Sequence, residues 1–148
     1  MTHYGPWLAT AVLGMLLCMP AYAENTDLGD GYQAYYQAMT THALDADDAR
    51  ELNIVRSRNT ALITISVRRD DNDGSYCTPE ADISGTVSSQ GEETKPLHFE
   101  TVRMKENVYQ LSTFTFRENE PMHVQITVRP TIEQQPTSIE FTQRFNVN

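Results

Sequence analysis

Apolar and polar residues alternate with a period of two along much of this chain. From residue 122 to residue 128 every second side chain is apolar and the intervening ones are polar. Since successive side chains of a strand point to opposite faces, this pattern predicts a strand with one buried and one solvated face. Residues 139–147 repeat the pattern, with Gln143 alone breaking the apolar face. We expect these two segments to be neighbouring strands joined by the loop 130–136.

Further segments carry the same strand signal, and they are separated by residues that favour turns. They are residues 32–41, 60–69, 81–88, 97–104 and 108–116. Only residues 45–52 are predicted to be helical, with Asp45 as the N-cap and acidic residues in the first turn. About seven short strands with one connector helix predict an all-β fold, an immunoglobulin-like antiparallel β-sandwich, with a closed barrel as the alternative. Residues 24–31 are expected to form a flexible leader.

The N-terminal segment has the features of an export signal. Residues 7–19 are apolar but too few to span a bilayer, and they are followed by Pro20 and the sequence Ala-Tyr-Ala. Cleavage is predicted after Ala23, which leaves residues 24–148 as a single periplasmic domain without a membrane span. No Lys or Arg precedes the apolar run, so a retained anchor and a lipoprotein signal at Cys18 stay open as alternatives.

Charge and cysteine content narrow the function classes. The net charge is −9, and such a surface repels nucleic acid and anionic lipid headgroups. Removal of the signal leaves Cys77 without a second cysteine, so an intrachain disulfide is excluded. We expect this thiol to be buried as a small apolar side chain rather than to act in redox chemistry.

One loop resembles a calcium-binding sequence in its spacing. Gly74 and Glu80 stand six residues apart, with Asp71 and Asp73 in two of the preceding ligand places. However, Arg69 occupies the first ligand place, and a strand precedes it where a helix is required. We therefore predict a solvated hairpin loop and no calcium site.

No other metal or catalytic motif is present. The histidines of the expected mature chain, His42, His98 and His123, fall on separate elements without metal-ligand spacing. Met122 and His123 are predicted to point to opposite faces of their strand, so they cannot share a copper ion. The pair Glu92-Glu93 lies in a polar loop, where it favours solubility over acid catalysis. We predict no cofactor, no metal and no catalytic residues.

The candidate binding surface is the sequence Arg56, Ser57, Arg58 and Asn59. In extended backbone the two arginines point the same way. They could bind a carboxylate or phosphate in a bidentate manner, but pairing with the acidic residues of segment 45–51 is the favoured interpretation.

Several short segments, in a fixed order, resemble a small proteobacterial family known as domain of unknown function 4426. They are residues 32–36, the acidic stretch 45–52, Arg56-Ser57-Arg58-Asn59 running into 62–67, residues 81–85, and residues 141–145. The resemblance covers nearly the whole chain after the export signal. It implies a periplasmic immunoglobulin-like β-sandwich, and it brings no established activity, ligand or catalytic residue.

Two functional hypotheses follow from these patterns. The first is a non-enzymatic periplasmic binding or accessory module that engages a protein, peptide or envelope component through a sandwich face, an open edge strand or the Arg56 to Asn59 corner. The alternative is a small-ligand carrier or enzyme with a site in the sandwich interior or its loops. Aromatic residues that could line such a site are Tyr35, Tyr36, Tyr109 and Phe116, although core packing is the favoured interpretation of them.

Overall fold

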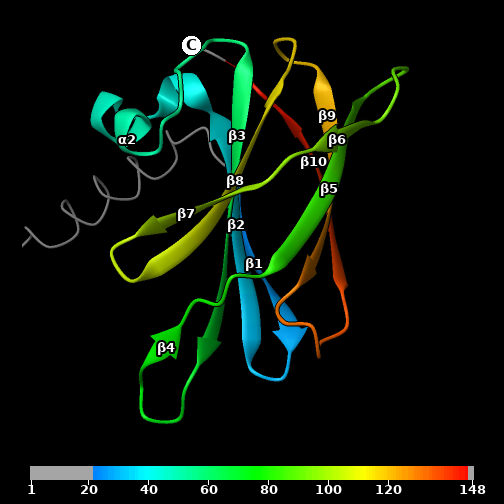
Figure 1. Cartoon of the computed structure of the whole chain (residues 1–148). Coiled ribbons are helices and arrows are strands. Elements are labelled where there is room, and N and C mark those ends of the chain that lie inside the picture. Colours follow the sequence, from blue (N-terminus) through cyan, green and yellow to red (C-terminus); the bar gives the residue numbers. More distant parts are fainter. Residues whose placement is uncertain (1–21, 147–148) are drawn as a thin grey trace, which may run out of the picture.

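A computed structural model describes residues 22–146 as two antiparallel β-sheets packed face to face (Figure 1). The six-stranded sheet has the order β1 (Tyr22–Gly29), β2 (Tyr32–Thr40), β3 (Thr60–Asp70), β8 (Asn107–Thr115) and β7 (Glu100–Met104), with β4 (Tyr76–Cys77) paired to β3. The four-stranded sheet has the order β10 (Thr137–Arg144), β9 (Pro121–Arg129), β5 (Asp82–Ser89) and β6 (Lys95–Leu97). The predicted all-β sandwich is confirmed, and the closed barrel is not what these residues form.

A short helical excursion connects β2 to β3. It consists of the 3-10 turn η1 (Thr41–Ala43) and the helix α2 (Ala46–Glu51). The carboxylate of Asp45 accepts a hydrogen bond from the backbone N–H of Asp47 at 2.9 Å, which is the expected N-cap. Among the described residues, neither helix has the length and apolar character needed to cross a membrane.

The expectation of a flexible leader over residues 24–31 is wrong. These residues belong to β1 and to the tight turn that joins it to β2, where Gly29, Asp30 and Gly31 all have positive φ. The strand escaped prediction because it is an edge strand of mostly polar sequence, in which Leu28 is the buried apolar residue. The predicted cleavage after Ala23 falls within β1, whereas the apolar run 7–19 lies outside the described residues.

The prediction of one strand over residues 97–104 is also wrong. The chain changes sheets here, because β6 pairs with β5 whereas β7 pairs with β8. Alternation reports which face is buried, but it does not report the partner strand, so the break at His98 and Phe99 was invisible in the pattern. The last strand ends at Arg144, and Phe145 stays buried just beyond it.

Cys77 is exposed, which contradicts its predicted burial. It lies in the two-residue strand β4, which pairs with the far end of β3 (Figure 1). That hairpin extends past the sandwich, so neither face of β4 has a facing sheet.

The apolar faces of the two sheets form one core. The ring of Tyr36 from one sheet stacks on that of Phe141 from the other, with centroids 5.8 Å apart. At the end of the sandwich that holds the β8–β9 loop, Phe145 contacts Phe114 and Phe116 at centroid distances of 5.6 and 5.2 Å. Aromatic pairs in such offset or edge-to-face arrangements add to the free energy gained by burial.

Gln143, which breaks the apolar face of β10, provides a test of this core. Its Oε1 atom is buried and accepts no hydrogen bond from any described residue, and its partner position across the strand pair is Met122. Because an unsatisfied buried carbonyl is costly and methionine has a similar shape, Gln143→Met is expected to raise the free energy of unfolding by about 1 kcal/mol in urea denaturation. The matched change Gln125→Met, on the exposed face of β9, should shift it by less than about 0.5 kcal/mol. A clear loss of stability in Gln143→Met would contradict this reading of the amide.

Candidate functional site

The four residues of the predicted binding corner lie in the loop between α2 and β3 and are held there by backbone contacts. Arg56 donates from Nη2 to the carbonyl oxygen of His42 at 2.9 Å. The hydroxyl of Thr41 accepts from the Ser57 N–H at 2.8 Å and donates to the Ser57 carbonyl at 3.0 Å. These bonds fasten the corner to η1.

The favoured pairing of this corner with the acidic residues of the helix is wrong, since no such ion pair forms among the described residues. Asp47 instead forms an ion pair with Arg50 at 2.7 Å, within the helical segment itself. In the part of the chain that the structure describes, Arg58 forms no ion pair. Arg56 is therefore bonded to the backbone of η1, and anion binding by the corner stays a prediction.

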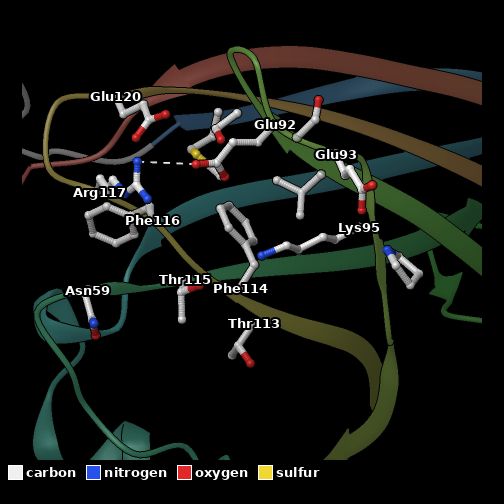
Figure 2. Close-up of a pocket in the computed structure, with 15 residues that line it drawn as sticks. Asn59, Glu92, Glu93, Lys95, Thr113, Phe114, Thr115, Phe116, Arg117 and Glu120 are labelled. Atoms are coloured by element: carbon white, nitrogen blue, oxygen red, sulfur yellow. Dashed lines mark ion pairs between the residues drawn. The ribbon is translucent and has the colours of Figure 1, made fainter.

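A cleft of about 550 Å³ lies at the end of the sandwich (Figure 2). Of the four corner residues, only Asn59 lines it. This cleft lies between the β5–β6 hairpin and the β8–β9 loop, where the two sheets part. Its floor is apolar and buried, and is formed by Val87, Phe114, Phe116 and Met122. Polar residues of the β5–β6 hairpin and of the β8–β9 loop form the rim of the cleft.

The rim carries charged side chains of both signs. Glu92, Glu93 and Lys95 come from the hairpin side, and Arg117 and Glu120 come from the loop side (Figure 2). Arg117 and Glu92 form an ion pair across the cleft at 3.3 Å, which ties the hairpin to the loop. Among the described residues the other three charges have no ion-pair partner.

Local hydrogen bonds shape the loop wall of the cleft. In the β8–β9 loop, the N–H of Glu120 donates to the carbonyl of Arg117 at 3.1 Å, and Asn119 adopts a positive φ of 64°. Asn119 is fixed further by its N–H bond to the Phe145 carbonyl at 3.0 Å and by Arg144, which donates to its carbonyl at 2.6 Å. The loop is therefore anchored to the end of β10.

This arrangement has the features of a ligand-binding site. The acidic side chains of the rim remain in contact with solvent, since Glu92 and Glu93 are exposed and Glu120 is half-buried. An apolar floor with a few polar groups around it is typical of ligand sites.

The sequence patterns identified only part of this cleft. Phe116 was named as a possible pocket residue and does line it, whereas Tyr35, Tyr36 and Tyr109 line a different hollow. The local sequence of Glu92 and Glu93 indicates solubilising charges. Nothing in their local sequence indicates that a loop from the other sheet faces them, because that proximity arises only from the packing of the two sheets.

The calcium-like loop forms the predicted hairpin between β3 and β4. The Ser75 hydroxyl donates to Asp73 and to Asp71, and the bonds from Ser75 to Asp73 hold the pKa of that carboxyl below its ordinary value. The carboxylate of Glu80 points instead to Arg103, at 3.0 Å. The acidic groups of this loop therefore have protein partners.

Met122 and His123 lie on opposite faces of β9, as expected. Met122 is buried in the floor of the cleft, and His123 is exposed with its Nδ1 atom 3.1 Å from the hydroxyl of Thr142. Within residues 22–146 no group of three or more His, Cys, Asp or Glu side chains is placed to hold a metal ion.

Comparisons with solved structures agree with this fold. The chain is similar to a DUF4426 family protein from Pseudomonas aeruginosa PAO1, with a TM-score of 0.69, 17% identity, and coverage of 85% of this chain and 97% of the other. It is also similar to FetP of uropathogenic Escherichia coli strain F11. A copper-bound FetP variant gives a TM-score of 0.56 at 9% identity, covering 85% of this chain and 97% of FetP. FetP as isolated, expressed recombinantly in the periplasm of E. coli, gives 0.57 at 10% identity, covering 86% and 98%.

At these identities the structural matches establish the fold alone. No curated protein matches the chain. The family model described as "Domain of unknown function (DUF4426)" matches residues 26–148, which is nearly all of the described chain, and the protein therefore belongs to the DUF4426 family.

Proposed function

We propose that this protein is a non-enzymatic binding module of the bacterial periplasm that holds a small zwitterionic ligand, an amino acid or short peptide, in the cleft. The observation that carries the proposal is the combination of a buried aromatic floor with rim charges of both signs that have no ion-pair partner among the described residues. The proposal gives a site to the expected binding module, and it draws on the carrier hypothesis in placing that site between the sheets.

The chemistry of the cleft suits such a ligand. The floor around Phe114 and Phe116 offers apolar contact to a side chain. The carboxylates of Glu93 and Glu120 can accept hydrogen bonds from an ammonium group, and Lys95 can donate to a carboxylate. Hydrogen bonds between charged partners are roughly twice as strong as neutral ones, so they would fix the orientation of the ligand.

Strand addition at the edge strands β6 and β10, or at β4, is less well supported. The edge strand β6 has three residues, one of which is Pro96, and β4 has two residues. On the opposite edge, β10 presents Glu140 and Arg144 on its solvated face. Short length, proline and charge are the features by which edge strands avoid pairing with other chains.

The periplasmic location rests on the export-signal pattern and on the periplasmic expression of FetP, a structural relative. The copper bound by the FetP variant is not part of the proposal for this chain. A copper site needs several converging ligands, and the cleft offers one thioether, that of Met122, without a histidine or cysteine.

Thermal unfolding of the exported protein with a panel of free amino acids and tripeptides tests the proposal. A ligand that binds only the folded state at 100 times its Kd adds about 2.7 kcal/mol of stability, which corresponds to roughly 10 °C in Tm. Lys95→Met should reduce that shift at least by half because it removes the cation expected to bind the ligand carboxylate. The matched change Lys105→Met, in the β7–β8 turn away from the cleft, should leave it unchanged.

The controls separate binding in the cleft from general effects. If no member of the panel raises Tm, the assignment of a zwitterionic ligand is wrong. If Lys95→Met and Lys105→Met keep the same shift as the unmodified protein, the ligand binds elsewhere on the molecule.

A further inference from the structure

A second hollow, of about 420 Å³, lies on the outer face of the six-stranded sheet, and we call it the trough. Tyr35 and Tyr109 form its sides, and Thr64 and Ser66 lie between them. Asn25 and Gln37 supply further side chains from β1 and β2. The trough shares no residue with the cleft.

Strand register explains why a trough forms here. Tyr35 of β2 pairs with Ser66 of β3. Ile65 pairs with Gln110 of β8, so the next position places Tyr109 beside Ser66 on its other side. With strands about 4.8 Å apart, the two tyrosines stand about 10 Å apart across a small serine. The missing bulk at Ser66 leaves the space between the rings.

The polar groups of the trough are almost all neutral. Asn25, Gln37, Thr64 and Ser66 offer amides and hydroxyls, which both donate and accept hydrogen bonds. The single carboxylate among the lining residues, that of Glu24, accepts a hydrogen bond from the Tyr36 hydroxyl at 3.3 Å. An anionic ligand would find no opposite charge among the lining residues to compensate its loss of water.

Tyr35 is held in position while its ring stays accessible. Its hydroxyl donates to Gln33 Oε1 at 3.0 Å, and 38% of the residue is exposed. The guanidinium of Arg68 lies 6.0 Å from the Tyr35 ring and 4.0 Å from that of Tyr76. Arg68 is paired with Asp70 at 2.7 Å, which raises the pKa of the arginine and neutralises its charge locally. The nearby cation therefore adds rigidity without making the surface basic.

From this arrangement we propose that the trough binds a neutral carbohydrate chain. A sugar ring has an apolar C–H face that packs on an aromatic ring, and its hydroxyls at the edge bond to amides and hydroxyls. Two accessible tyrosines about 10 Å apart, with neutral donors and acceptors between them, match both features. The net charge of −9 further disfavours polyanionic glycans.

Isothermal titration of the exported protein with three neutral hexasaccharides tests this proposal. The probes are linear chains of N-acetylglucosamine, of β-1,4-linked glucose and of α-1,4-linked glucose, with polygalacturonate as the charged comparison. We expect at least one neutral chain to bind and polygalacturonate not to bind. Tyr35→Ala and Tyr109→Ala should each weaken binding about tenfold, and Tyr35→Phe should retain most of it, because stacking needs the ring and not the hydroxyl.

Tyr76→Ala is the matched control. Tyr76 is also an exposed tyrosine near Arg68, but it does not line the trough, so its loss should leave the affinity unchanged. Circular dichroism of each variant separates lost binding from lost fold. Failure of all three neutral chains to bind overturns the proposal, and so does binding that folded Tyr35→Ala and Tyr109→Ala leave intact. Because Lys95→Met affects the cleft alone, the failure of either site is distinguishable from the failure of the other.

Discussion

Replacing Phe145 with alanine is expected to lower the free energy of unfolding by about 4 kcal/mol. The side chain is 2% exposed, and its ring contacts those of Phe114 and Phe116. Removal of a buried ring costs its transfer free energy and leaves a cavity, because the surrounding sheets relax only in part. The free energy of unfolding of a domain is typically about 5–15 kcal/mol, so this one change removes a large fraction of it.

The same substitution should affect the cleft. Phe114 and Phe116 form its floor and rest on Phe145, so their positions are less well defined without it. We expect urea denaturation to show the loss of stability, and we expect any ligand of the cleft to bind more weakly to the folded variant. Ile132→Ala removes an apolar side chain that is 85% exposed and should change stability by less than about 0.5 kcal/mol. Equal stability of the two variants would contradict the buried position of Phe145.

The strands that the sequence predicted well are those with one buried and one solvated face. In β9, alternate residues from Met122 to Val128 are buried, as the period of two requires. The polar edge strand β1 and the two-residue strand β4 carry no such alternation, and both were missed. Propensity and pattern describe single segments, whereas the exchange of sheets between β6 and β7 depends on which strands lie beside them.

The candidate site was harder to predict for the same reason. The corner from Arg56 to Asn59 stands out because its residues are adjacent in sequence and basic in an acidic chain. The cleft combines Lys95 of the hairpin with Arg117 of a loop that follows a strand of the other sheet. Their proximity follows from the packing of the two sheets, and single-sequence patterns contain no record of that packing.

Gly85 lies in one of the segments that resemble the family, and its substitution is the second change expected to have a large effect. It pairs with Ile126 of β9 on one side and with Leu97 of β6 on the other. A Cβ atom added at Gly85 would lie 2.8 Å from the backbone oxygen of Gln125 and 3.4 Å from atoms of Ile126. Since the nearest atom belongs to the backbone, it cannot rotate away as a side chain could, and β5 and β9 must separate.

We therefore expect Gly85→Ala to lower the free energy of unfolding by about 3 kcal/mol, the upper part of the range for overpacked cores. Gly85→Val should cost more, because its two methyl groups add to the same conflict. Ser84→Ala, one position earlier on the exposed face of β5, should be nearly neutral. Urea denaturation of the three variants measures the order of their free energies of unfolding.

Because β5 leads directly into the hairpin that carries Glu92, Glu93 and Lys95, folded Gly85→Ala should also lose affinity in the cleft. Binding in the trough on the other sheet should persist. A Gly85→Ala protein as stable as Ser84→Ala would show that the two strands have room for a Cβ atom, which contradicts the close approach on which the expectation rests.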